Sequence, residues 1–224
     1  MTSPWRWLPK AKRYQNTKTG RFIGPKQMEV LRDTFVQAQY AKMEALVDRM
    51  DRQQITRREW VTASRDVIRG TLVDLYALGK GGRGAMTQAD YGRVGAMAKY
   101  HYQKLQGFEA DVRDGKLTLS RAKYRAKQYI TAVKQAFERG RVASYGIPGL
   151  PAMPGEGSEC LYNCKCKWRI VETDTEWLCY WELSTVEHCP TCARRGQMWN
   201  PYRIPKTMAR FAAAPGEVLW AGMV

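Results

Sequence analysis

The pattern of apolar and polar residues changes along the chain. Between residues 25 and 145, apolar side chains recur every three or four positions, which is the spacing of one face of an α-helix. After residue 165, apolar and polar side chains alternate as in a β-strand. The pattern predicts a mainly α-helical chain, either a helical bundle or extended helical hairpins, with a small C-terminal β-hairpin module and extended arms.

Four amphipathic helices are expected, and several have recognisable end signals. Pro25 suits a first helical position. Thr56 and Glu59 have the spacing of a capping box, in which the two residues satisfy each other's backbone N–H groups. The expected helices cover about 25–50, 56–78, 87–112 and 120–140.

Prolines and glycines between residues 146 and 157 mark the end of the helical region, because such a segment cannot continue a helix. Beyond it, residues 166–172 and 177–183 are expected to pair as a hairpin, with paired positions summing to about 349. The predicted organisation is an N-terminal arm (1–24), a basic helical domain (25–145), a Pro/Gly linker (146–157), a cysteine-rich β-hairpin module (158–199) and a C-terminal arm (200–224).

The net charge of +16 lies entirely in the first two thirds of the chain. Residues 1–150 contain 29 Lys and Arg against 13 Asp and Glu, whereas residues 151–224 contain 8 of each kind. Such an excess indicates a polyanionic neighbour, nucleic acid or an acidic protein surface, although a solvated basic face is the plainer alternative. The expected nucleic-acid-binding residues are on the outer face of the fourth helix: Arg121, Lys123, Arg125, Lys127 and Lys134.

Aromatic residues are concentrated near both ends of the chain. In residues 1–24 they alternate with Lys and Arg, a composition that binds a nucleic-acid backbone with stacking or packs against another subunit. Exposed tryptophans are unfavourable on a monomer, so both arms are expected to order against a partner; the alternative is that they fold back onto the bundle. The partner-binding candidates are Trp5, Trp7, Trp199 and Trp220.

Five of the six cysteines form two short clusters, Cys160, Cys164 and Cys166 in the first and Cys189 and Cys192 in the second. The predicted hairpin brings both clusters to one end of the ribbon. Two cysteine loops at the open end of a hairpin are typical of structural zinc sites. The chain shows no signal peptide or membrane-spanning run, so we expect a cytosolic location, where structural disulfides are rare. We therefore predict that a structural Zn²⁺ ion binds these cysteines and stabilises the β-hairpin module.

Other interpretations of the cysteines remain open. Five thiols exceed the four positions of a tetrahedral site, so one cysteine, or His188, is surplus. Disulfides and unligated thiols are alternatives, and a redox role is less favoured because the βαβ context of thioredoxin-like sites is absent. Cys179 falls in the middle of a predicted strand and is expected to be a buried free thiol.

No catalytic motif can be assembled, and we expect no enzyme activity. The segment "GKGGRG" fits G-x-G-x-x-G at Gly79, Gly81 and Gly84, but it follows a predicted helix, so a flexible loop between helices is expected. His101 and His188 are the two histidines of the chain, and His101 is expected to be a packed or surface residue.

The segments "GLPAMPGEGSECLYNCKCKW" and "WELSTVEHCPTCARRG" resemble the cysteine-rich end of the minor head, or head morphogenesis, proteins of tailed bacteriophages, the Mu F-like group. The segment "YQNTKTGRFIG" is similar to the opening of such proteins. The strong resemblance covers about residues 140–205. In many members the C-x-x-C element precedes the C-x-C element, whereas here it follows, which leaves the ligand set open.

This resemblance implies a low-copy virion component that acts in head assembly. Such a protein binds the portal protein, and the major capsid protein as a further partner, in multiple copies around the portal. It faces packaged DNA through non-specific backbone contacts, in the head interior or at the portal vertex, and occupies the host cytoplasm during assembly. A zinc-ribbon nucleic-acid-binding regulator and a metal-dependent nuclease are the alternatives. The neutral charge of the cysteine region and the lack of an open-site ligand set disfavour them.

Overall fold

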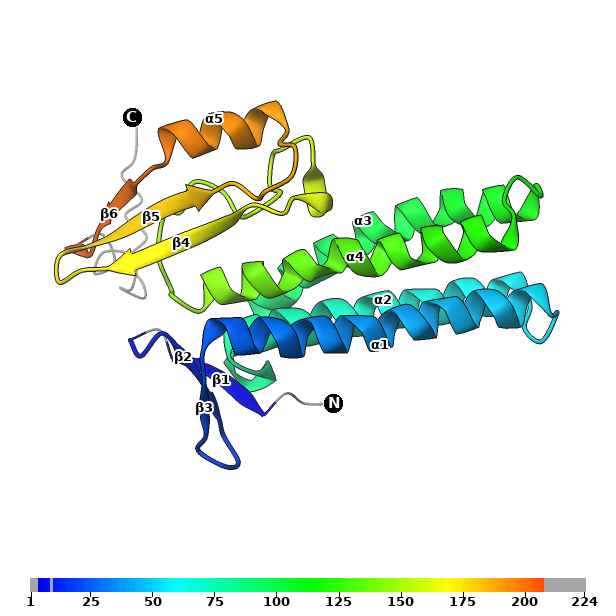
Figure 1. Ribbon diagram of the computed structural model, residues 1–224, viewed down its shortest axis with the longest axis horizontal. Coiled ribbons are helices and arrows are strands. Elements are labelled where there is room, and N and C mark those ends of the chain that lie inside the picture. Colours follow the sequence, from blue (N-terminus) through cyan, green and yellow to red (C-terminus); the bar gives the residue numbers. More distant parts are fainter. Residues whose placement is uncertain (1–3, 9, 208–224) are drawn as a thin grey trace, which may run out of the picture.

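A computed structural model describes residues 4–8 and 10–207, which form a four-helix core with a small antiparallel sheet on either side (Figure 1). The helices are α1 (Pro25–Asp51), α2 (Arg57–Lys80), α3 (Gln88–Arg113), α4 (Leu119–Ala143) and α5 (Pro190–Met198), with short 3₁₀ turns η1 (Arg83–Ala85) and η2 (Leu161–Asn163). The strands are β1 (Trp5–Leu8), β2 (Arg13–Asn16), β3 (Phe22–Ile23), β4 (Lys167–Glu172), β5 (Glu176–Glu182) and β6 (Tyr202–Pro205). The expected fold class, mainly α-helical with a small C-terminal β module, is confirmed.

The four long helices begin where local side-chain chemistry favours a helix start. The Thr56 hydroxyl accepts a hydrogen bond from the Glu59 N–H at 3.2 Å, and a Glu59 carboxylate oxygen accepts one from the Thr56 N–H at 2.7 Å. Thr87 and Asp90 form the same reciprocal arrangement at the start of α3. These caps satisfy N–H groups that a helix leaves unpaired. The predicted capping box at Thr56 is therefore confirmed.

Helices α2 and α4 cross at glycines. A Cβ atom on Gly140 would clash with the Tyr76 carbonyl, and one on Gly79 would clash with the Phe137 carbonyl. Gly79 lies inside α2 and is buried, so the prediction that it belongs to a flexible loop is wrong. The loop begins later, at Gly81 and Gly82, whose φ angles of 103° and 102° are left-handed conformations that favour glycine.

Residues 5–23 form a three-stranded sheet, which we call the N-terminal sheet, and the prediction of an extended arm at 1–24 is wrong for them. Tyr14 pairs with Trp7 on β1 and with Ile23 on β3, so these three side chains share the inner face. Tyr14 stacks on Phe137 of α4 with ring centroids 6.4 Å apart. Alternation within four-residue strands places these aromatic side chains in the helical core. Helical periodicity does not reveal such short strands.

Residues 158–207 form the second unit, which we call the cysteine module. Its hairpin pairs Lys167 with Glu182 and Ile170 with Cys179, so the predicted sum of 349 is confirmed. The predicted C-terminal arm is wrong for Tyr202–Pro205, which form β6 and pair with β5. The rest of that arm, from residue 208 onward, lies outside the described residues.

The cysteine module is fixed to the C-terminal half of α4 by polar contacts. The Arg141 guanidinium donates to the Trp168 carbonyl at 2.6 Å, and Gln135 Nε2 donates to the Cys164 carbonyl at 3.1 Å. The Pro/Gly segment also contacts α4, because the Pro154 carbonyl accepts two hydrogen bonds from the Arg139 guanidinium. Because α4 contacts both the module and its linker, the module has a defined position against the bundle.

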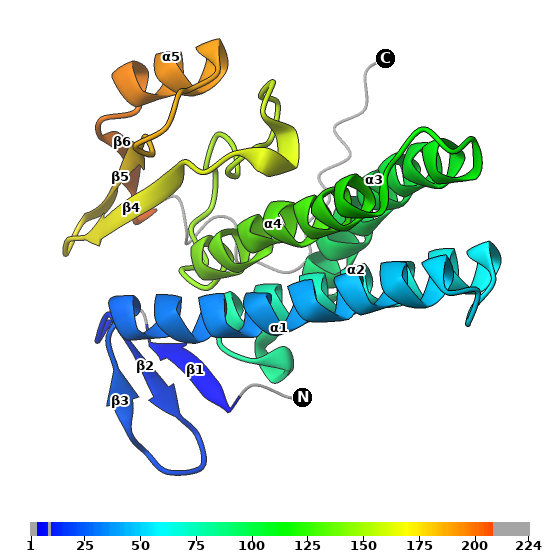
Figure 2. The same ribbon diagram turned by 45° about the vertical axis from the view of Figure 1, so that its right-hand side comes forward.

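The N-terminal sheet and the cysteine module both lie at the end of the bundle where α1 begins and α4 ends (Figures 1 and 2). They occupy different sides of the bundle, the sheet beneath α1 and the module above α4. Among the described residues, no helix is long and apolar enough to cross a membrane.

Candidate metal centre and basic surfaces

The five clustered cysteines are carried by two loops that meet beside the β4–β5 hairpin. Cys160 and Cys164 flank the 3₁₀ turn η2, and Cys166 directly precedes β4. Cys189 is the N-cap residue of α5, and Cys192 is in the first turn of that helix. A helix N-terminus has unpaired N–H groups and a positive dipole end, so it stabilises a thiolate.

Three of these thiols lie close enough to bind one ion. The sulfur atoms of Cys160, Cys164 and Cys192 all lie within 4.8 Å of one another. The distance between Cys164 Sγ and Cys192 Sγ is 3.6 Å. Zinc–sulfur bonds of about 2.3 Å in a tetrahedron separate the sulfur atoms by about 3.8 Å. The arrangement therefore matches the core of a thiolate metal site.

Cys166 and Cys189 are the other two clustered cysteines, and neither belongs to the trio of mutually close sulfurs among the described residues. Cys166 is hydrogen-bonded to Cys164 and Cys192, and it is buried. Cys189 is hydrogen-bonded to Cys160, with a further backbone hydrogen bond at Cys192. Three of the five predicted metal ligands thus lie within reach of one ion, and Cys166 and Cys189 each interact with members of that trio. His188 does not belong to the trio of mutually close ligand atoms that the described residues form.

The thiols influence one another's protonation. Burial raises the pKa of Cys160, and a hydrogen bond with Cys166 together with burial raises that of Cys164. Burial and the neighbouring Cys164 raise the pKa of Cys192. Hydrogen bonds lower the pKa values of Cys166 and Cys189, although burial opposes both shifts. Adjacent thiolates repel each other, and a bound divalent cation removes that repulsion, so the cluster favours a cation once its protons leave.

Glu159 connects the two cysteine loops, and the sequence did not single it out. Its carboxylate accepts a hydrogen bond from the Thr191 hydroxyl at 2.9 Å. Hydrogen bonds with Cys189 and Thr191 lower the pKa of Glu159 to about 2. The sequence offers one indication of a role for Glu159, its position next to Cys160, because a residue beside a ligand can orient the site.

Cys179 and His101 are buried away from the cluster. Cys179 is fully buried in β5 as a free thiol, which confirms its predicted state, and burial raises its pKa to about 11. His101 is 2% exposed on α3, and burial lowers its pKa to about 4. It is therefore a neutral packed residue near pH 7.

A groove of about 930 Å³ separates the cysteine loops from α1 and α4. Cys160, Cys164, Cys166 and His188 line one wall, and Glu29 lies on the opposite side. The cluster is thus reachable from solvent along this groove while Cys164 and Cys192 themselves remain buried.

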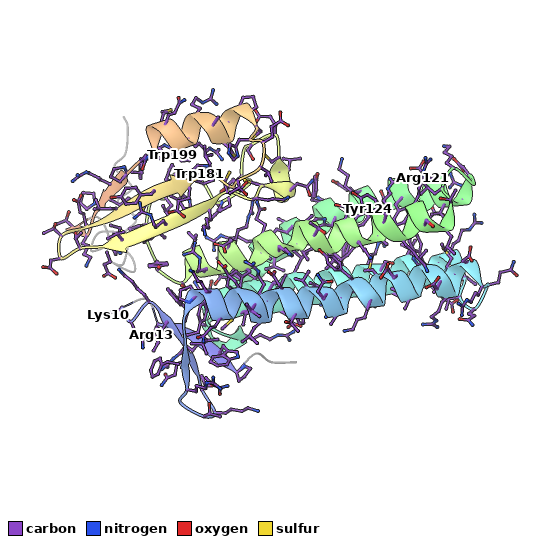
Figure 3. The ribbon with its side chains drawn as sticks, viewed as in Figure 1. Lys10, Arg13, Arg121, Tyr124, Trp181 and Trp199 are labelled. Carbon is purple, nitrogen blue, oxygen red and sulfur yellow. The ribbon has the colours of Figure 1, made fainter. Side chains whose placement is uncertain are left out.

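Four of the five predicted nucleic-acid-binding residues form ion pairs with neighbouring helices. Lys123 contacts Asp48 at 2.6 Å and Lys127 contacts Glu44 at 2.8 Å, which joins α4 to α1. The other two pairs are Lys134 with Asp33 and Arg125 with Asp111. The expected solvent-facing row is therefore largely a seam between helices, because α4 lies beside both α1 and α3. Arg121 is at the far end of α4 (Figure 3), and no ion pair joins it to another described residue.

The partner-binding tryptophans are mostly packed within the protein. Trp7 is 5% exposed in the helical core, and Trp5 is half-buried against it. Trp199 stacks on Trp168, with ring centroids 5.5 Å apart, beside Trp181 (Figure 3). The prediction that these aromatics order only against a partner is wrong for Trp7 and Trp199, because each packs within its own chain. Trp220 lies outside the described residues.

Comparisons with protein-family models, with curated proteins and with solved structures find no match for this chain.

Proposed function

We propose that the chain is a non-enzymatic structural protein of a tailed-bacteriophage head. In this proposal it is a minor head protein that joins the portal and the coat during assembly, in several copies around the portal, and faces packaged DNA. Its place is then the head interior or the portal vertex, after assembly in the host cytoplasm. The proposal rests on the resemblance of residues 140–205, which include the cysteine loops, to the minor head proteins.

The observation that carries the proposal is the convergence of the two cysteine elements, the first of which directly follows the Pro/Gly segment. This is the part of the chain in which the resemblance lies, and the resemblance requires that its two cysteine elements form one site. Cys160, Cys164 and Cys192 meet that requirement by their mutual distances. A chance likeness between two short segments would not require them to meet in space.

We further propose that the cluster binds one structural Zn²⁺ ion. Four thiolates suit Zn²⁺, which prefers sulfur ligands in closed tetrahedral sites. Cys160, Cys164 and Cys192 supply three of them, and Cys189 supplies the fourth because a C-x-x-C pair at a helix N-terminus shares one ion readily. When bound, the ion links η2 to the start of α5. Cys166 is then a neighbouring thiol beside the site.

The alternative, a zinc-ribbon nucleic-acid-binding regulator, is less well supported. A regulator reads bases with basic residues on its zinc module or on a recognition helix. Here the module is close to neutral, since residues 158–207 contain 7 basic and 6 acidic residues. Arg169 and Arg203 are also paired with Glu182 and Glu176.

The test of the proposed function is the composition of heads made by a phage that encodes this chain. Purified heads should contain the protein at a fixed ratio to portal, and heads made without it should form at lower yield. Coexpression with the portal protein of the same genome should give a complex that survives gel filtration. If purified heads lack the chain and the portal does not retain it, the proposed function is wrong.

A further inference from the structure

The first 26 residues have a basic excess that no acidic residue offsets. They contain seven Lys and Arg, and the first acidic residue of the chain is Glu29. The basic residues are Arg6, Lys10, Lys12, Arg13, Lys18, Arg21 and Lys26. All seven are exposed. No described carboxylate forms an ion pair with any of them.

The N-terminal sheet divides its side chains between two faces. Its inner face packs Trp7, Tyr14 and Ile23 against the helical core. Alternation along the strands therefore sends the intervening residues to the outer face. These are Arg6, Leu8, Arg13, Gln15 and Phe22. On that face the Arg6 guanidinium donates a hydrogen bond to Gln15 Oε1 at 3.1 Å, which orients the guanidinium along the sheet.

The two turns of the sheet extend the basic surface in opposite directions. Lys10 and Lys12 lie between β1 and β2, whereas Lys18 and Arg21 lie between β2 and β3. Lys12 and Lys18 bracket β2, and at strand rise their six-residue separation is about 20 Å. The major groove of B-DNA is about 12 Å wide. Cations on the two turns can therefore reach phosphates on both sides of a groove.

The basic side chains of the N-terminal sheet are freer to bind a phosphate than those of α4. Lys123 and Lys127 already contact carboxylates at 2.6 and 2.8 Å, so a phosphate that binds them must compete with an internal partner. Lys10 and Arg13 are exposed and project from the end of the sheet that lies beyond the start of α1 (Figure 3). A phosphate there replaces only water and small counterions. Release of those counterions favours binding.

We propose that the outer face of the N-terminal sheet, together with its two turns, binds the sugar–phosphate backbone of double-stranded DNA without sequence preference. The duplex is the favoured form, because single-strand platforms stack successive bases on several exposed aromatics. This sheet exposes Phe22 but turns Trp7 and Tyr14 inward. The choice of DNA rests on the proposed function, whereas the location of the surface rests on charge and burial alone.

The experiment compares the full chain with two sets of variants that remove equal charge. The sheet set changes four exposed cations to Gln: Lys12, Arg13, Lys18 and Arg21. The control set changes four exposed cations of α1, α2 and α3 that have no ion pair among the described residues: Lys42, Arg49, Arg57 and Lys99. Binding of a labelled 30-base-pair duplex of arbitrary sequence is followed by anisotropy from 50 to 200 mM salt, and circular dichroism verifies the fold of each variant.

Log affinity falls with log salt, and each phosphate contact contributes about 0.9 to the magnitude of that slope. The sheet set should therefore reduce the magnitude of the slope by about 3 to 4. The control set should leave that slope within about one of the unchanged protein. Equal losses in both sets would mean that binding follows net charge, and the proposal would be wrong. Absence of duplex binding at 50 mM salt by the unchanged protein would also overturn it.

Two further arms distinguish other occupants of the surface. Phe22→Ala should not change duplex affinity. A large loss for Phe22→Ala, together with tighter binding of single strands, would show a stacking surface instead of a duplex surface. Polyglutamate that displaces the duplex at lower charge concentration than competitor DNA would indicate an acidic protein partner. Because none of these assays involves heads or portal, the DNA surface can fail while the proposed function stands, and the reverse also holds.

Discussion

Cys164 Sγ lies 3.6 Å from Cys192 Sγ, although 28 residues separate these cysteines in the chain. The contact joins the loop before β4 to the first turn of α5, and the β4–β5 hairpin lies between them in sequence. Any group that links the two sulfurs therefore closes the cysteine module around its hairpin.

Zinc should copurify with the protein at about one ion per chain, because four thiolates complete one tetrahedral site. Elemental analysis of protein prepared with reductant and without added metal measures this ratio. Titration with a mercurial reagent should release the ion. The zinc site would be contradicted if the protein contained no metal and mass spectrometry under non-reducing conditions showed that the cysteines form disulfides.

Cys192→Ser should abolish most zinc binding and destabilise the cysteine module, since this buried thiol belongs to the trio of close sulfurs. Helical content should change little, because the four-helix core has its own buried cluster. Circular dichroism and metal analysis report the two effects separately. Cys179→Ser is the matched control, a buried thiol away from the site, and it should retain the metal.

Cys189→Ser and Cys166→Ser distinguish the fourth ligand. If Cys189 binds the ion, its replacement should remove most of the bound zinc. Replacement of Cys166, a neighbour of the site, should weaken zinc affinity by about 10- to 100-fold at most. Competition with a chromophoric chelator measures both affinities. The opposite ranking of the two variants would assign the fourth position to Cys166.

Gly140→Ala should destabilise the bundle by about 1 to 3 kcal/mol, because the added methyl group meets the Tyr76 carbonyl and forces α2 and α4 apart. Gly95→Ala, at an exposed position of α3, is the control, since a Cβ there meets nothing within 4 Å. It should stabilise the protein by about 0.5 to 1 kcal/mol through helix propensity. Chemical denaturation compares the free energies of unfolding. A neutral Gly140→Ala would show that the helices do not cross at this close distance.

Asp90→Asn should cost about 1 to 3 kcal/mol, because Asp90 is a buried carboxylate that accepts hydrogen bonds from Thr87 and Tyr76. Asp74→Asn, which affects a more exposed pair with Arg83, should cost less than about 1 kcal/mol. Denaturation midpoints of the two variants decide the ranking.

The same carboxylate predicts a pH dependence. Burial alone would raise the pKa of Asp90, but hydrogen bonds from Thr87 and Tyr76 lower it below its ordinary value of 3.8. The unfolded chain therefore takes up the proton at a higher pH than the folded chain does. The stabilisation is complete above about pH 5, well above the ordinary pKa, and is lost as the pH falls through the lowered pKa. The free energy of unfolding, measured between pH 5 and pH 2, should therefore depend less on pH in Asp90→Asn than in the unchanged protein.

Local signals in the sequence predicted much of the fold. Thr56 caps α2 as expected, and the hairpin has its expected register at Ile170 and Cys179. Both features depend on interactions between residues close in sequence, which a linear pattern records directly. The meeting of the two cysteine loops at Cys160, Cys164 and Cys192 followed from that register, because the register fixed which loops meet.

The remaining features depend on contacts between distant residues. Whether Lys127 faces solvent or Glu44 is decided by how α4 lies beside α1, and helical periodicity does not contain that information. The sequence pattern predicts an arm at Trp7 and Tyr14, because strands of four residues are too short to show a clear alternation. Their burial requires a helical surface that forms elsewhere in the chain.

The N-terminal sheet and the cysteine module occupy one end of the bundle, which leaves the turns near Gln54 and Lys116 at the other end (Figure 1). A helix of about 25 residues is about 38 Å long, so those turns stand tens of ångströms from the cysteines. A peptide tag inserted at either turn would therefore disturb neither the zinc ligands nor the basic strands. The distal turns therefore offer a place to label the protein for electron microscopy.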